Sequence, residues 1–152
     1  MRISTKATIC AVVLAAVAGV AFAGFAKPEE AIRYRQAVMT VIGQQLGQLA
    51  GVIKGETPYD KKNVERDADV IKLMSELPWE AFMFPGSDKG NTSLKPSAFK
   101  EKDKFMAVAT QFEGETRKLA DIAKNGDLEA LRAQFGTVVQ TCKTCHSTYR
   151  SR

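Results

Sequence analysis

Histidine and cysteine are scarce in this chain of 152 residues, which has one His and three Cys. Paired imidazoles are therefore excluded, and no general acid and base pair of the usual kind can be recognised. No run of alternating β-branched and polar residues predicts a strand, so the chain is expected to be all-α. No basic stripe interleaved with aromatic residues suggests nucleic acid as a partner. We expect neither enzymatic turnover nor nucleic-acid binding.

The few reactive side chains that do occur lie together at residues 142–146, near the end of the chain. The segment reads Cys142-Lys143-Thr144-Cys145-His146, which is the C-x-x-C-H signature of c-type haem attachment. On a helix, positions i, i+3 and i+4 lie on one side, so two thiols and one imidazole can meet one porphyrin. The motif predicts one haem c per chain, attached through Cys142 and Cys145, with His146 as the proximal iron ligand.

Three other uses of this motif are weaker. A redox dithiol normally begins a helix in a βαβ unit, whereas this pair ends a helical chain. A structural zinc site needs four ligands, commonly in two separated pairs, and no second pair exists. A simple disulfide between Cys142 and Cys145 remains a third alternative.

The first 23 residues have the features of a secretory signal peptide. Arg2 and Lys6 precede the apolar run 7–20, and Ala21-Phe22-Ala23 forms an A-x-A cleavage site. The run is short for a transmembrane helix, although a retained anchor is the alternative. We expect a periplasmic mature domain, 24–152, without a stable membrane anchor. Cleavage removes Cys10 and two cations, so the net charge falls from +5 to +3, which is compatible with an acidic partner.

Residues 24–152 contain four stretches with helical periodicity. The first follows Pro28 and extends to Ile53, and the second runs from an Asp60 N-cap to about Leu77. The third is expected to begin at a Ser97 cap and to end at Asn125-Gly126, and the fourth runs from an Asp127 cap through Tyr149. The long loop 79–96 holds the only Trp. Short connections favour an antiparallel up-down-up-down four-helix bundle with haem in its core.

Three glycines recur every fourth residue in the first helix, at Gly43, Gly47 and Gly51. They make one flat face, where a second subunit could approach closely, or they are simply tolerated weak positions. A homodimer through the first two helices is therefore one of two open interpretations.

Three sequence stretches together resemble the class II c-type cytochromes, the cytochrome c-prime family. They are Tyr34-Arg35-Gln36, the turn Lys54-Gly-Glu-Thr-Pro-Tyr-Asp60, and Cys142-Lys-Thr-Cys-His146-x-x-Tyr149-Arg150. The C-terminal position of the haem motif is itself a mark of class II. The resemblance implies that the bundle holds haem in its core and that Arg35, Gln36 and Arg150 contact it. An Arg suits a haem propionate because its planar fork pairs with carboxylate.

The family has two branches, which differ in the residue opposite the proximal His. In the low-spin branch a Met supplies the sixth iron ligand and the protein carries electrons. In the high-spin branch an apolar residue covers five-coordinate iron, which binds nitric oxide or carbon monoxide. The resemblance places Met39 at this position, one helical turn after Arg35. It predicts a carrier of single electrons between redox proteins, with gas binding as the alternative and with Met39 as a packing residue in that case.

Overall fold

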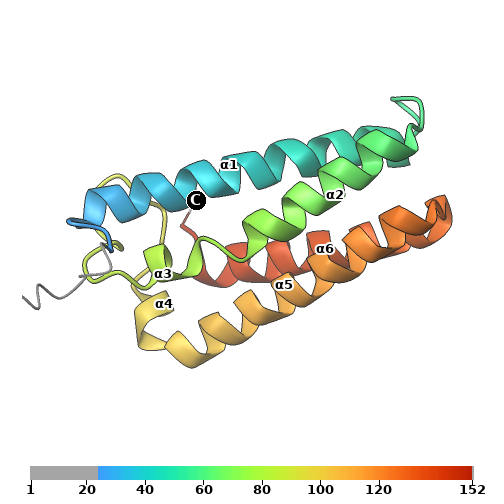
Figure 1. Ribbon diagram of the computed structural model, residues 1–152. Helices are drawn as coiled ribbons and strands as arrows, with labels where there is room; N and C mark the ends of the chain where they lie inside the picture. The colour runs from blue at the N-terminus through green and yellow to red at the C-terminus, as the bar shows by residue number, and fades with distance from the viewer. Residues whose placement is uncertain (1–23, 152) are drawn as a thin grey trace, which may run out of the picture.

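The computed structural model describes residues 24–151, so the predicted signal peptide, 1–23, lies outside the described residues. Four long helices form an antiparallel bundle (Figure 1). They are α1 (Pro28–Ile53), α2 (Lys61–Ser75), α5 (Lys102–Asn125) and α6 (Leu128–Tyr149). Two short helices, α3 (Trp79–Phe82) and α4 (Ser97–Lys100), lie in the connection between α2 and α5. The expected all-α bundle is confirmed.

The long helices begin and end at residues whose chemistry favours those positions. Pro28 is the first residue of α1, where its missing N–H costs nothing. The Asp60 carboxylate accepts a hydrogen bond from the Asn63 N–H at 2.8 Å. Asp127 accepts two backbone N–H groups of α6 at 3.0 Å each. Gly126 ends α5 with φ of 74°, a left-handed conformation that glycine adopts without strain.

Two boundaries differ from the prediction. The second helix ends at Ser75 rather than at about Leu77. Ser97 does not cap the third long helix, because it begins α4 and its hydroxyl is buried without a hydrogen-bond partner. The backbone bends at Glu101, with φ of −117° and ψ of 41°, before α5 begins. The helical periodicity continued through this bend, so the pattern alone did not reveal it.

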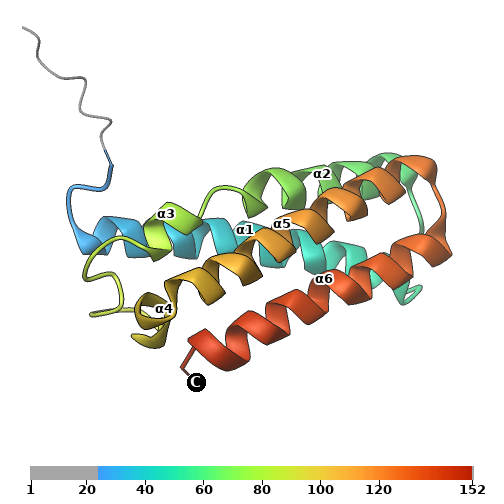
Figure 2. The ribbon, with the colours of Figure 1, turned by 90° about the horizontal axis from the view of Figure 1, so that it is seen from below.

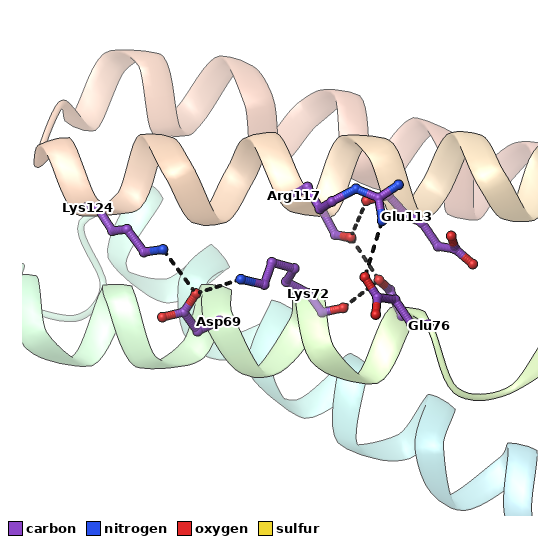
Figure 3. A network of polar contacts seen from close by, with 8 residues as sticks. Asp69, Lys72, Glu76, Glu113, Arg117 and Lys124 are labelled. Atoms are coloured by element: carbon purple, nitrogen blue, oxygen red, sulfur yellow. Dashed lines mark hydrogen bonds and ion pairs between the residues drawn. The ribbon is translucent and has the colours of Figure 1, made fainter.

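The interface between α2 and α5 combines apolar packing with polar contacts (Figure 3). The hydroxyls of Ser75 and Thr116 are 2.9 Å apart and both side chains are buried. Nearer the surface, Arg117 donates to Glu76 at 3.2 Å. The main core extends along the bundle and is built from these buried side chains: Val38, Ile42, Leu49, Val64, Ala68, Ile71, Phe112, Leu119, Ala120, Ala123, Leu131 and Val138.

The end of α6 is held by the loop that precedes α4 (Figure 2). Leu94 and Arg150 form an isolated antiparallel bridge, in which the Lys95 N–H donates to the Tyr149 carbonyl at 2.8 Å. The Ser151 N–H donates to the Ser93 carbonyl, also at 2.8 Å. A second apolar cluster of Leu94, Ala98, Phe105 and Tyr149 lies beneath this bridge. The last turn of α6, which carries His146, is therefore anchored to a segment about fifty residues away in sequence.

Within residues 24–151, no helix is long and apolar enough to cross a membrane. A side chain added at Gly43 or Gly47 would meet no atom within 4 Å, because both positions face open space. Gly51 is different, since a Cβ there would lie 3.0 Å from the Thr57 hydroxyl. The proposed association surface is therefore open at two of its three glycines, and dimerisation remains a prediction.

Candidate functional site

A small cavity of about 40 Å³ lies where α1, α3, α5 and α6 meet. Each of these helices contributes to its wall. The lining residues are Met39 from α1, Trp79 from α3, Val108 and Phe112 from α5, and Thr141, Cys142, Cys145 and His146 from α6. The fold thus brings Met39 to the same cavity as the complete C-x-x-C-H motif, across more than a hundred residues of sequence.

The two cysteines are free thiols and both are half-buried. Burial raises the pKa of the Cys142 thiol, and burial together with the neighbouring Cys142 raises the pKa of Cys145 to about 11. A buried thiol disfavours its charged form because the apolar surroundings solvate a thiolate poorly. Both groups are therefore protonated at neutral pH in the polypeptide itself.

His146 is affected in the opposite sense. Burial and the positive charge of Arg150 lower the pKa of its imidazole. The neutral form, which offers a nitrogen lone pair to a metal, is therefore favoured at neutral pH. Arg150 follows His146 by one helical turn, and this spacing explains its electrostatic influence.

These residues fit a covalently attached haem. Two thiols, one neutral imidazole and one thioether are the donors that such a group uses, and Trp79, Val108 and Phe112 provide an apolar wall. The cavity is smaller than the roughly 300–1,000 Å³ typical of ligand pockets. Among residues 24–151, no group of three or more His, Cys, Asp and Glu side chains is arranged to hold a bare metal ion.

Arg35 does not line the cavity and is bound to α3 and to the loop between α3 and α4. Its side chain is 2% exposed and donates to the Ala81 carbonyl at 2.9 Å. It also donates to the Ser87 hydroxyl and carbonyl, at 2.8 and 2.6 Å, and to the Thr92 hydroxyl at 2.7 Å. The guanidinium carbon lies 4.9 Å from the centroid of the Phe82 ring, a cation–π contact. A haem contact by Arg35 stays a prediction, because both of its terminal nitrogens already have acceptors.

The surroundings of Arg35 also change its acid strength. Burial lowers its pKa to about 10, and the negative charge of Asp88 opposes this change. The group nevertheless remains cationic at neutral pH, so its four hydrogen bonds are charge-assisted. Arg35 therefore joins α1 to the loop one helical turn before Met39.

Gln36 and Arg150, the other predicted haem contacts, are exposed and lie outside the cavity wall. The Gln36 amide donates to the Asn91 carbonyl at 3.0 Å. The Arg150 Nε donates to the Ser93 hydroxyl at 3.3 Å. Their haem contacts also remain predictions, and both residues already secure the 91–93 loop to a long helix.

The sequence did not identify four residues of the wall, namely Trp79, Val108, Phe112 and Thr141. A signal existed for Trp79, since it is the only Trp and a large aromatic ring in a long loop usually packs against the core. In the structure its ring packs on Phe82, Phe105 and Phe112. Phe112 is a buried aromatic residue of α5, whereas nothing in the pattern separates Val108 and Thr141 from ordinary helix positions.

Known proteins resemble this chain over most of its length. The family model described as cytochrome c′ matches residues 30–150. The chain is 38% identical over 128 residues to cytochrome c′ of Alcaligenes xylosoxydans xylosoxydans, with 84% of this chain and 98% of that protein covered. Cytochrome c prime from Shewanella frigidimarina superimposes with a TM-score of 0.82 at 32% identity, covering 85% of this chain and all of that one.

A further similar structure is a nitric oxide complex. It is a point mutant of cytochrome c prime from Alcaligenes xylosoxidans, with a TM-score of 0.79 and 38% identity. The alignment covers 85% of this chain and 100% of that chain.

Proposed function

The chain belongs to the cytochrome c′ family, whose members bind covalently attached haem c, and from this premise we propose that it carries single electrons between redox proteins of the periplasm. In this proposal, Cys142 and Cys145 attach the haem, His146 is the proximal iron ligand and Met39 is the distal ligand. No enzymatic turnover is proposed.

The observation that carries this proposal is the shared cavity. Met39 and His146 belong to helices at opposite ends of the chain, yet both line a space of about 40 Å³ together with the two thiols. Met39 is the one methionine in that wall. Met39 also packs against the main core, and a packing residue at this position would face the motif as well. The thioether adds what an apolar side chain lacks, a sulfur that can ligate iron.

When bound, haem supplies a one-electron redox centre. The protein contributes everything else that shapes its behaviour. The thioether of Met39 and the neutral imidazole of His146 are uncharged ligands, which favour the ferrous over the ferric state relative to anionic ligands and so raise the potential. The apolar wall of Trp79, Val108 and Phe112 acts in the same direction because it excludes water.

Gas binding is the second candidate function. The observation in its favour is the nitric oxide complex of the similar cytochrome c prime from Alcaligenes xylosoxidans. In this alternative Met39 does not ligate iron, and its side chain acts as a steric gate on the distal side for nitric oxide or carbon monoxide.

Absorption spectra of the oxidised and reduced protein separate the two functions. An electron carrier with Met39 as a ligand shows sharp low-spin bands and a sulfur-to-iron charge-transfer band in the ferric form. Carbon monoxide then changes the ferrous spectrum only slowly. A broad high-spin spectrum that changes at once with carbon monoxide would refute Met39 ligation and favour gas binding.

Export and association complete the proposal. In this proposal the signal-like segment 1–23 directs the mature domain to the periplasm, and N-terminal sequencing of the secreted protein tests cleavage after Ala23. The open face at Gly43 and Gly47 supports a homodimer through α1 and α2. Sedimentation of the mature protein as a strict monomer would contradict the dimer.

A further inference from the structure

Two segments of the mature chain have no acidic residue. Residues 89–100 contain three lysines, and residues 130–151 contain two arginines and one lysine, with no Asp or Glu in either. The rest of residues 24–151 has thirteen Lys or Arg against seventeen Asp or Glu. The positive charge of the domain is therefore concentrated in these two segments, and the remainder of residues 24–151 has a net negative charge.

The fold joins the two segments at the end of α6 that carries the haem motif (Figure 2). Beyond the bridge between Leu94 and Arg150, the Lys95 ammonium donates to the Ser147 and Thr148 carbonyls, at 3.3 and 3.1 Å. These carbonyls belong to the last turn of α6, where a positive charge is favourable. Lys95 and Arg150 are thus held within a few residues of His146.

Glu101 is the acid that acts on Tyr149 at this end of α6, and it pairs with Lys104 at 3.0 Å. Within the described residues, Lys95, Lys143 and Arg150 form no ion pair, whereas Arg132, at the far end of α6, pairs with Glu129 at 3.7 Å. Lys143 is exposed and lies inside the attachment motif, between the two cysteines. Its charge is therefore presented to solvent beside the point where the cofactor is attached.

From these observations we infer that the surface formed by Lys95, Lys143 and Arg150 is the docking face for an acidic redox protein. This inference rests on the proposed electron-carrier function, since an electron must leave through a surface near the haem. Unpaired charges of one sign steer an oppositely charged partner and accelerate encounter at low ionic strength. Membrane attraction is the less suitable explanation, because polybasic lipid-binding clusters typically have about 4–8 cations.

The test uses two small redox reagents of opposite charge with the holoprotein. Hexacyanoferrate(III) is an anion and tris(phenanthroline)cobalt(III) is a cation, and each accepts one electron from the ferrous protein. We expect Lys143→Glu to slow oxidation by the anion roughly three- to tenfold at low ionic strength and to speed oxidation by the cation. The difference should fall below about twofold in roughly 0.5 M salt, where the Debye length is only a few ångströms.

Lys62→Glu is the matched control. Lys62 is exposed, lies in the first turn of α2 at the opposite end of the bundle, and makes no ion pair within the described residues. The Lys62→Glu variant changes the net charge by the same amount as Lys143→Glu, but far from the haem motif. Its rates of oxidation by both reagents should therefore remain those of the wild type. Equal effects of the two variants, or no effect of Lys143→Glu, would overturn the docking face.

A protein probe and a lipid probe complete the test. We expect reduction of the ferric protein by a reduced plant-type ferredoxin, an acidic protein, to slow in Lys143→Glu and not in Lys62→Glu. Binding to phosphatidylglycerol vesicles that Lys143→Glu abolishes, with unchanged ferredoxin rates, would overturn the inference in favour of a membrane surface. Unchanged rates in a low-spin protein refute only the docking face. A high-spin spectrum of the wild type refutes the carrier function, and the docking face with it.

Discussion

Replacing Arg35 by Met tests whether this buried cation holds the loop between α3 and α4 on α1. Methionine retains much of the apolar length of the side chain and removes all four hydrogen bonds to Ala81, Ser87 and Thr92. The Ser87 carbonyl loses its only hydrogen bond among the described residues. The Thr92 hydroxyl still accepts from the Leu94 N–H, so its loss is smaller.

The expected cost follows from these partners. An orphaned buried carbonyl costs about 1–3 kcal/mol, and the weaker acceptors and the lost contact with Phe82 add roughly 1 kcal/mol. Relief from burying a charge offsets part of this, in line with the lowered pKa of Arg35. We therefore expect the free energy of unfolding to fall by about 1–3 kcal/mol, a sizeable part of the ~5–15 kcal/mol typical of a domain.

Guanidinium chloride unfolding, followed by circular dichroism on equally haem-loaded samples, measures this loss. Arg35→Lys should recover only part of it, because an ammonium lacks the planar fork that reaches several acceptors. Arg33→Met is the control, since Arg33 is exposed on the same helix and should change stability by less than ~0.5 kcal/mol. Equal stabilities of the Arg35→Met and Arg33→Met variants would refute the role of Arg35 as the loop's anchor.

Three other changes probe the helix start, the interface and the site. Asp127→Ala removes two hydrogen bonds at the start of α6 and should lower the free energy of unfolding by about 1 kcal/mol in thermal denaturation, while Asp127→Asn, which still accepts them, should cost less. A double-mutant cycle of Ser75→Ala and Thr116→Val should give a coupling of about 1 kcal/mol, and zero coupling would contradict a hydrogen bond between the two hydroxyls. In the haem-free protein, iodoacetamide alkylates the thiolate of Cys145, so the alkylation rate should rise with pH and reach half its maximum near the pKa of about 11. An alkylation midpoint near pH 9 would contradict burial of the thiol. Because folding raises the pKa of Cys145 above the unfolded value of 9.0, this group's contribution to stability should be full below pH 9 and decline as the pH rises toward 11.

Local signals in the sequence were sufficient for most of the architecture. Pro28, Asp60, Gly126 and Asp127 act within one turn of their own positions, and the helices begin or end where these residues predict. Ser97 failed as a predictor because tertiary packing bends the chain at Glu101 and buries the hydroxyl. Local preferences for starting a helix predict its boundary poorly wherever tertiary packing favours a different backbone path.

The candidate site was indicated by a contiguous sequence motif and by family resemblance rather than by local helix signals. Cys142, Cys145 and His146 form a contiguous motif, and its chemistry fixes their spacing. Met39 was indicated by the family resemblance and lines the same cavity in the structure, while its role as a ligand stays a prediction. The loop partners of Arg35 could not be predicted, because they lie about fifty residues away and are mostly backbone carbonyls and hydroxyls, which no side-chain pattern reveals.

The ferric absorption spectrum of a Met39→Leu variant is the most direct test of the central claim. Leucine has nearly the volume of methionine and no sulfur, so it removes the ligand without opening a large cavity. Met106→Leu, on α5 and away from the cavity wall, is the control. We predict that Met39→Leu loses the sulfur-to-iron charge-transfer band, becomes high-spin and binds carbon monoxide rapidly, while Met106→Leu keeps the wild-type spectrum. An unchanged low-spin spectrum in Met39→Leu would contradict the claim that Met39 is the distal ligand.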